Sequence, residues 1–204
     1  MTNAAIATDQ GRVEFLHCFF SAATHDASAA MCRWTGGLIS MRLDEVREMP
    51  LEEVCAEYDF GCDLLTMIVL SLQGDLGGDM ILTFDEDNGR QLAASLLRRQ
   101  VGDAPEWSEL EKSALMETGN ILGCAYMNAL TKLVGTQLVP SPPTFLQDYG
   151  ASVLEQALMA QAMTCDNVLI CRTSFEQQGE QLNWNVFFVP SDALRTAMQN
   201  AIDN

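Results

Sequence analysis

An internal repeat constrains the fold of this chain more than any other feature of its sequence. When the sequence is shifted by 99 residues against itself, Gly36 coincides with Gly135, and the halves align without a gap over about their first 30 residues. Further along, the second hairpin is a few residues longer. No linker-like stretch separates the halves, so we interpret the repeat as a gene duplication within one pseudo-symmetric domain, residues 1–204, with half-repeats at about 1–104 and 105–204.

Each half has the pattern of a helix, a strand, a hairpin and a second helix. In the first half we expect these elements at residues 13–35, 38–46, 63–84 and 85–97, with Asp85 as the cap of the last helix. In the second half we expect a helix from Ser108 to Val134 that ends at Gly135, an extended stretch over 136–143, a short helix over 148–162, a hairpin over 167–189 and a last helix capped by Ser191. Hairpins from both halves would join in one mainly antiparallel sheet with the long helices packed on it, which is an α+β fold of the sandwich type.

The charge of the chain narrows its range of partners. Acidic residues outnumber basic residues by 28 to 11, which gives a formal net charge of −17. Such a surface repels DNA, RNA and anionic lipid, so we expect no nucleic-acid or membrane partner. The N-terminus lacks the basic region of a signal peptide, and the strongest apolar run, Leu64–Leu72, is too short to cross a bilayer. We therefore expect a cytoplasmic protein, and a protein partner with a basic patch is compatible with its charge.

The cysteines and histidines do not form a metal-binding pattern. Seven cysteines occur, and no two of them form a Cys-x-x-Cys pair. Their odd number and apolar neighbours favour small buried side chains in a reducing compartment over a set of disulfide bonds. His17 and His25 lie in one helical stretch without zinc-ligand spacing around them. We therefore expect no metal site and no cofactor of the protein's own.

The helix expected from Ser108 to Val134 is apolar around most of its circumference but carries one polar stripe. Six side chains fall on this stripe at steps of three or four residues: Ser113, Glu117, Asn120, Cys124, Asn128 and Thr131. A solvated glutamate and a structural asparagine are the alternative explanation, because a bare Glu-x-x-Asn pair is common in chains of this size. A second such pair, Glu180 and Asn183, lies in an expected strand, where side chains three residues apart point to opposite faces.

A longer spacing is more specific than the pair alone. The spacing of four residues matches the signature of the CheC/CheX/FliY phosphatases. Three residues separate Ser113 from Glu117, two separate Glu117 from Asn120, and twenty-two separate Asn120 from Pro143. The segment METGNILGCAYMNALTKLVGTQLVPSPP also resembles CheC sequences, and the likeness continues through PLEEV in the first half. It covers essentially the whole chain. Members of this family act on the phosphorylated chemotaxis response regulator CheY.

The resemblance implies a phosphatase for the aspartyl phosphate of a CheY-type response regulator, with Glu117 and Asn120 as its catalytic residues. The carboxamide of Asn120 would hold the attacking water, as a glutamine does in GTPases. Glu117 would pair with the active-site lysine of the regulator, which also holds the Mg²⁺. Ser113 and Pro143 would support the site, the first beside Glu117 and the second by fixing the extended loop near Asn120.

The first half departs from the pattern of many CheC proteins, which carry the pair in both halves. The 99-residue alignment places three pairs of residues opposite each other: Cys18 and Glu117, Ser21 and Asn120, and Asp44 and Pro143. Neutral Cys18 supplies no anion for a lysine, and no base is spaced to make it a nucleophile. The hydroxyl of Ser21 lacks the reach of a carboxamide. We therefore expect one active site per chain and a first-half helix that is a structural remnant or a repurposed surface.

Two non-catalytic functions fit the same resemblance. The protein could be a CheC-like adaptor for the deamidase CheD, or a relative of the flagellar-switch proteins. Switch proteins of this family usually carry an additional C-terminal domain, and the last expected helix reaches almost to Asn204, which argues against that role. An adaptor would have no reason to keep Glu117 and Asn120 in register with Pro143, whereas CheD binding and catalysis could coexist.

Overall fold

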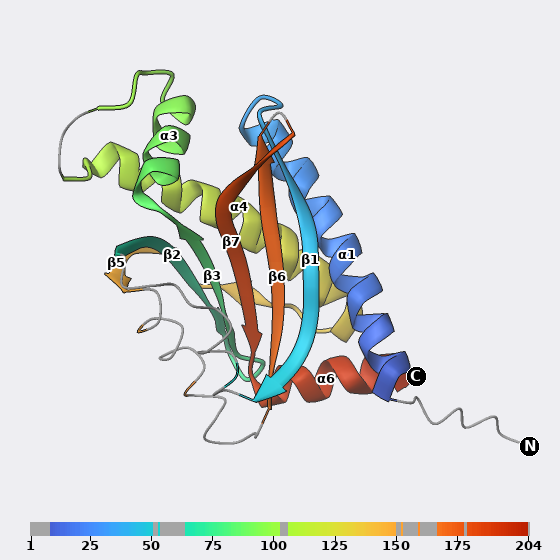
Figure 1. The fold of residues 1–204 in the computed structure, drawn as a ribbon. Helices are drawn as coiled ribbons and strands as arrows, with labels where there is room; N and C mark the ends of the chain where they lie inside the picture. The colour runs from blue at the N-terminus through green and yellow to red at the C-terminus, as the bar shows by residue number, and fades with distance from the viewer. Residues whose placement is uncertain are drawn as a thin grey trace, which may run out of the picture.

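The computed structural model describes residues 9–50, 53, 64–102, 106–149, 152, 159, 167–177 and 179–203. The described helices are α1 (Asp9–Trp34), α3 (Glu86–Leu96), α4 (Glu109–Val134) and α6 (Asp192–Asp203). The described strands are β1 (Ile39–Pro50), β2 (Leu64–Gln73), β3 (Gly78–Phe84), β4 (Val139–Pro140), β5 (Thr144–Tyr149), β6 (Asn167–Gln177) and β7 (Glu180–Pro190). Figure 1 shows α1 and α4 behind the sheet, with α3 and α6 at its opposite ends.

All the described strands belong to one sheet in which each neighbouring pair is antiparallel. The strand order is β1-β6-β7-β3-β2-β4, and β5 also pairs with β2. At both ends of the sheet the halves exchange strands: first-half β1 pairs with second-half β6, and second-half β5 pairs with first-half β2. The two hairpins meet in the middle, where β3 pairs with β7. The expected α+β fold, with long helices on an antiparallel sheet, is confirmed.

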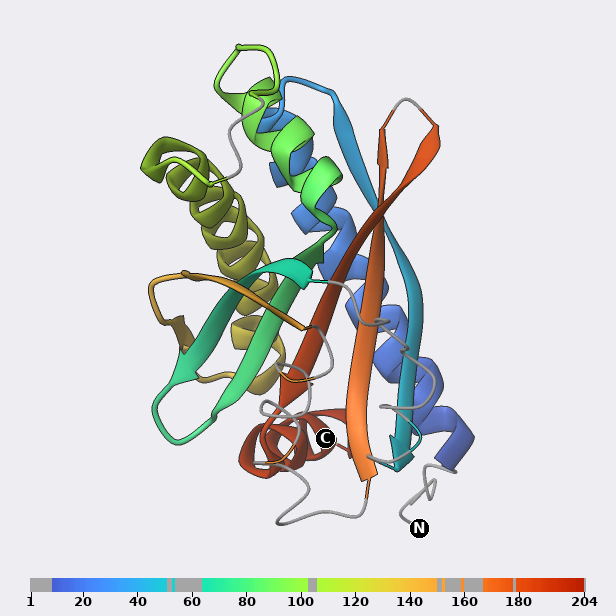
Figure 2. The same ribbon diagram turned by 60° about the vertical axis from the view of Figure 1, so that its left-hand side comes forward.

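The two long helices lie side by side on one face of the sheet, as Figure 2 shows from a second direction. A buried polar contact joins them to each other and to β6. The Tyr126 hydroxyl lies 2.7 Å from Thr24 Oγ1 of α1 and 3.0 Å from Thr173 Oγ1 of β6. Burial raises the pKa of Tyr126 to about 12, against the lowering effect of these two hydrogen bonds. The hydroxyl therefore stays neutral and links three elements at one point of the core.

Burial repeats along α1 and α4 with the 99-residue spacing. Six pairs of equivalent positions are buried in both helices: Leu16 and Leu115, Phe20 and Gly119, Ala23 and Leu122, Thr24 and Gly123, Ala27 and Tyr126, and Met31 and Leu130. The two helices therefore turn equivalent faces to the sheet. The caps of the shorter helices, Asp85 and Ser191, lie 106 positions apart, so the extra residues of the second half come before its last helix. The boundaries of the half-repeats within 1–204 stay a prediction.

Helix α4 lies close against β2 because two glycines line the contact. A Cβ atom added to Gly119 would lie 2.4 Å from Cγ2 of Ile68. One added to Gly123 would lie 2.7 Å from Cδ2 of Leu70. Both distances are well below van der Waals contact between carbon atoms. The missing side chains therefore set the height of α4 above the sheet, and with it the position of the residues beside Gly119.

A capping box fixes the N-terminus of α4. The backbone N–H of Ser108 donates to Glu111 Oε2 at 2.9 Å, and the backbone N–H of Glu111 donates to Ser108 Oγ at 3.4 Å. Glu111 is buried, and its other oxygen pairs with Arg99 at 2.8 Å. Burial alone would raise the pKa of Glu111, but the hydrogen bonds from Ser108 and the charges of Arg99 and Arg90 outweigh it and hold that pKa below its usual value.

One expected element starts in the wrong place. The helix expected over 148–162 cannot begin at Asp148, because Asp148 and Tyr149 form the end of β5 and pair with Leu65 and Leu64 of β2. Most of that range lies outside the described residues. Strand β5 was not expected from the sequence, because only Phe145 among its residues is even half-buried and no apolar alternation marks it.

The cysteines also differ from expectation. Cys18, Cys32 and Cys124 are exposed, and only Cys171 is buried among the cysteines that the structure describes. The first three lie on the outer sides of α1 and α4, where apolar neighbours in sequence point to the sheet while the cysteine does not. Burial raises the pKa of the Cys171 thiol well above its usual value, so this residue is a small neutral core side chain.

Within the described parts of the chain, no helix is both long and apolar enough to span a membrane. The same residues contain no group of three or more His, Cys, Asp or Glu side chains placed to hold a metal ion.

Replacing Gly119 with Ala should destabilise the protein, because the new methyl group meets the β-branched side chain of Ile68, which cannot turn away. Overpacking of this kind costs about 1–3 kcal/mol, and better helix propensity returns about 0.5–1 kcal/mol. We expect a net loss of about 1–2 kcal/mol in the free energy of unfolding, measured by urea denaturation. Gly123→Ala is the matched control and should cost clearly less, because its methyl group meets the rotatable end of Leu70. Wild-type stability in Gly119→Ala would show that α4 can move away from β2.

Glu111→Gln should lower stability at neutral pH and lose its effect in acid. Because the folded protein lowers the pKa of Glu111, the carboxylate contributes stability above its ordinary value of 4.5, and this contribution disappears as the pH falls through the lowered value. We expect a deficit of about 1–2 kcal/mol at neutral pH that vanishes in strongly acidic solution, followed by urea denaturation at several pH values. Glu109→Gln, at an exposed position of the same turn, should change little at any pH. A deficit of constant size at all pH values would rule out the charge of Glu111 as its cause.

Candidate active site on helix α4

The polar stripe of α4 lies on the outer side of the helix, as its spacing predicts. The side chains of Ser113, Glu117, Cys124 and Asn128 are exposed, and those of Asn120 and Thr131 are half-buried. Much of the remaining circumference is buried, including Leu115, Leu122, Tyr126 and Leu130. The helix therefore presents one accessible polar edge from a rigid support.

Glu117 and Asn120 lie on one turn and reach each other. Asn120 Nδ2 donates to Glu117 Oε2 at 3.5 Å, and Asn120 Oδ1 accepts from Cys124 Sγ at 3.8 Å. Both contacts are at the long end of the hydrogen-bond range, so they orient the carboxamide without holding it tightly. Glu117 forms no ion pair with any residue that the structure describes. The pair therefore offers an uncompensated anion beside a neutral group that both donates and accepts.

The segment that follows α4 runs back along the helix. Near the end of the helix, the backbone N–H of Leu138 donates to Thr131 Oγ1 at 3.0 Å. Near its start, Lys112 Nζ lies 5.8 Å from the centre of the Phe145 ring. Pro143 lies between these two anchors and is half-buried. The proline of the signature thus lies on a segment that contacts α4 near both of its ends.

Ser113 is less firmly tied to the pair. It lies one turn before Glu117 and is exposed, and its hydroxyl makes no hydrogen bond with a described residue. A hydroxyl at this position can reach a ligand on the outer side of the helix as readily as it can reach Glu117. The supporting role of Ser113 stays a prediction.

A contact between the long helices at the turn of Glu117 was not expected from the sequence. Trp34, the last residue of α1, donates from Nε1 to Thr118 Oγ1 at 3.2 Å. Thr118 is buried, and Trp34 is 39% exposed. The indole therefore holds the turn that carries Glu117 to the neighbouring helix. No local pattern could predict this bond, because its partners come from different halves.

The first-half counterparts of the pair lie at equivalent but chemically different places. Cys18 and Ser21 are both exposed on α1. The residue opposite the signature proline, Asp44, lies in β1 beside a shift of the strand register. Asp44 accepts a hydrogen bond from Ser174 Oγ of β6 at 2.9 Å, and Arg172 lies 3.9 Å away. Asp44 is thus part of the contact between β1 and β6.

Comparisons with known proteins show what the chain and its fold are similar to. No family model matches the chain. The chain is 30% identical over 173 residues to the CheY-P phosphatase CheC of Bacillus subtilis (strain 168), with 82% of each protein covered. Its fold is similar to Thermotoga maritima FliY (TM-score 0.69, 17% identity, 96% of this chain and 97% of that one). It is also similar to the FliM middle domain of H. pylori (TM-score 0.64, 10% identity, 94% of this chain and 99% of that one). A chain of the Borrelia burgdorferi CheX-CheY-BeF3-Mg+2 complex is similar as well (TM-score 0.57, 16% identity, 88% of this chain and 99% of that one).

Sequence and fold therefore lead to one family. The identity to CheC extends over most of both chains, and the solved structures share the arrangement of helices on a seven-stranded sheet. Three of the signature residues, Ser113, Glu117 and Asn120, lie on the outer side of α4. The chain belongs to the CheC family, within the larger CheC/CheX/FliY group.

Proposed function

We propose that this protein is a phosphatase that hydrolyses the aspartyl phosphate of a CheY-type response regulator, with one site per chain formed by Glu117 and Asn120. The observation that carries the proposal is their exposed pairing on one edge of a buried helix, in a chain 30% identical to a CheY-P phosphatase. Such an edge can contact the active site of a partner, because it lies on the outer side of α4.

Asn120 would position the attacking water. Its carboxamide oxygen would accept a hydrogen from the water while its N–H donates to an oxygen of the phosphoryl group. The water oxygen forms the new bond to phosphorus as the bond from phosphorus to the aspartyl oxygen breaks. The aspartate leaves as a carboxylate, and the water proton stays with the released phosphate. Because an acyl phosphate is already activated, alignment of the water is the main contribution required.

Glu117 would dock the helix on the regulator. Its carboxylate has no cationic partner among the described residues, so it can meet a lysine ammonium group of the regulator. A carboxylate near a phosphoryl group is repelled unless a cation lies between them. The proposed arrangement avoids that repulsion, because Glu117 meets the cation and the uncharged Asn120 meets the phosphate.

Pro143 and Ser113 would support the site without taking part in the reaction. We assign Pro143 to stiffening of the segment that follows α4, because proline fixes its own backbone angle. Ser113 would contact either Glu117 or the partner from one turn earlier. The proposed reaction needs no cofactor bound by this chain, since the Mg²⁺ belongs to the phosphorylated regulator.

A non-catalytic function is the second candidate, since the fold is also similar to FliM. In that case the chain would bind CheD or a flagellar-switch component without hydrolysing phosphate. Phosphate release from phosphorylated regulators, measured with and without the protein, separates the two functions. An adaptor would leave the release rate unchanged for each candidate regulator of the same organism.

Asn120→Ala should reduce the dephosphorylation rate by about tenfold to a hundredfold, the range of lost positioning effects. The fold should be unaffected, because the side chain is only half-buried and its two hydrogen bonds are long. Phosphate release from the phosphorylated regulator is the measurement. Asn128→Ala is the matched control: it makes the same chemical change two turns further along the stripe, at an exposed position, and should retain wild-type activity. Full activity in a folded Asn120→Ala protein would exclude the mechanism proposed for this residue.

Two double variants test the number of sites. Glu117→Ala with Asn120→Ala should leave only the intrinsic dephosphorylation of the regulator, because the carboxylate and the carboxamide are both gone. Cys18→Ala with Ser21→Ala should keep catalysis near wild type, since both side chains are exposed and neither can replace the pair. A substantial residual rate in the first variant, or a collapse in a folded second variant, would show that α1 takes part.

A further inference from the structure

The tryptophan at the end of α1 is exposed, whereas the other two tryptophans of the chain are buried. Trp34 is 39% exposed, against 6% for Trp107 and 2% for Trp184. A large apolar ring in contact with water forgoes the stability that its burial would supply. Tryptophan is also among the side chains that contribute most binding energy to protein interfaces. The ring of Trp34 is therefore a candidate contact for a protein partner.

Two hydrogen bonds fix the indole of Trp34 at its polar edge. Its Nε1–H donates to Thr118 Oγ1 at 3.2 Å, and the hydroxyl of Thr118 donates to the backbone carbonyl of Ala114 at 3.0 Å. Thr118 is fully buried, so the polar edge of the ring is directed inward and the exposed part of the ring is mainly carbon. A side chain that is already fixed loses little conformational freedom when a partner covers it.

The indole lies close to Glu117, although it belongs to the other half of the chain. Glu117 directly precedes Thr118, so Trp34 Nε1 lies at most about 10 Å from the Cα atom of Glu117. Glu117 and Thr118 are about 100° apart around α4, which places the indole on the flank of the polar stripe that meets α1. A standard interface covers about 800 Å² of each partner, a patch of about 16 Å in radius. A partner centred on Glu117 therefore reaches Trp34.

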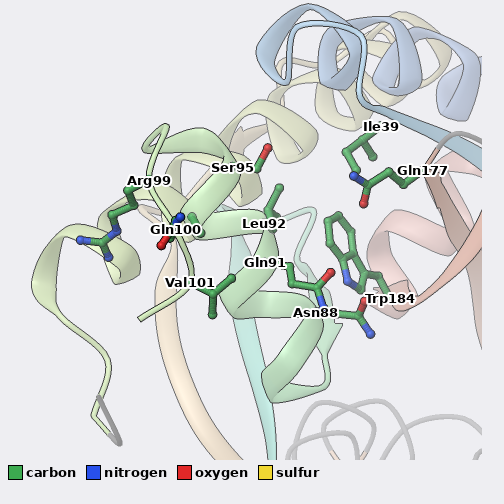
Figure 3. Close-up of a pocket in the computed structure, with 11 residues that line it drawn as sticks. Ile39, Asn88, Gln91, Leu92, Ser95, Arg99, Gln100, Val101, Gln177 and Trp184 are labelled. Atoms are coloured by element: carbon green, nitrogen blue, oxygen red, sulfur yellow. The ribbon is translucent and has the colours of Figure 1, made fainter. Parts of the chain in front are cut away.

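This surface is separate from a pocket beside α3. The pocket has a volume of about 360 Å³, and Ile39, Gln177 and Trp184 line it opposite α3, as Figure 3 shows. Neither Trp34 nor any residue of the polar stripe belongs to its lining. Small molecules bind in concave sites of this kind. An exposed helix edge with a fixed aromatic ring beside it suits a protein partner instead.

We propose that Trp34 contacts the response regulator beside the lysine that Glu117 meets, so that both halves of the chain contribute to one docking surface. The inference rests on the proposed function, since it takes the regulator as the partner of Glu117. The exposed part of the indole would pack on an apolar surface of the regulator, while Nε1 keeps its hydrogen bond to Thr118. Trp34 would strengthen binding without changing the reaction, because it does not touch the phosphoryl group.

The affinity for CheY-type regulators of the same organism, each activated with beryllofluoride as an analogue of the phosphoryl group, tests the proposal. Trp34→Ala should weaken binding by about tenfold to a hundredfold, as for a central interface residue, measured by titration calorimetry. Phe15→Ala is the matched control, because Phe15 is an aromatic residue of the same helix that is 37% exposed. It lies 19 positions before Trp34, about 28 Å along the helix, and should bind like the wild type.

Two further measurements separate a contact from a structural role. Thr118→Val removes the hydrogen bond but keeps the indole, and should change the affinity by less than about threefold. In NMR spectra of the wild-type protein, the indole N–H signal of Trp34, assigned by its loss in Trp34→Phe, should shift when the regulator binds. The signals of the buried Trp107 and Trp184 should stay in place. The NMR measurement does not depend on the folding of Trp34→Ala.

Wild-type affinity in a folded Trp34→Ala protein, an unmoved Trp34 signal at saturation, or an equal loss of affinity in Thr118→Val would overturn the inference and leave the proposed phosphatase function in place. Weaker binding by Trp34→Ala, in a protein whose wild type releases no phosphate, would support the docking surface and contradict the proposed function. Absence of binding to every regulator of the organism would contradict both. At saturating regulator, phosphate release by Trp34→Ala should stay within about twofold of the wild-type rate.

Discussion

Neither half of the chain has a complete sheet without the other. The first-half strand β1 pairs with second-half β6, second-half β5 pairs with first-half β2, and the two hairpins join at β3 and β7. An isolated hairpin is marginally stable in water, and three or more strands with an apolar face are needed for independent stability. The exchange of strands supplies them to both hairpins at once. The halves are therefore parts of one structural unit, although the sequence repeats.

The same exchange explains why a half without the Glu117–Asn120 pair still matters to the candidate site. Helix α4 carries both residues, but it rests on β2 of the first half, where Ile68 lies under Gly119. The segment that contains Pro143 continues into β5, which pairs with the same strand. The second half thus provides the chemical groups, and the first half provides the surface that sets their position. A helix held in this way can present a side-chain pair with little loss of conformational freedom on binding.

Local patterns predicted the features that depend on local physics. Helix α4 begins after Ser108 because of a capping box, and it ends at Gly135, whose φ of 68° is left-handed. The outer position of the polar stripe follows from its helical spacing. Strand β5 was missed because an exposed edge strand needs no apolar alternation. The hydrogen bond from Trp34 to Thr118 and the pocket beside Trp184 form between segments that are distant in the sequence. A short stretch of sequence does not show which distant segments come into contact.

The unequal packing of the two long helices also affects how such a protein can change during evolution. Where α4 has Gly119, α1 has Phe20, whose buried ring packs against Phe188 with ring centres 5.7 Å apart. New polar side chains at Cys18 and Ser21 would therefore project from a helix that has a buried phenylalanine where α4 has a glycine. A pair on α1 placed like Glu117 and Asn120 on α4 would also require changes in the core, and such changes usually cost stability. Substitutions at the exposed positions alone would therefore leave the aromatic side chain beneath them unchanged.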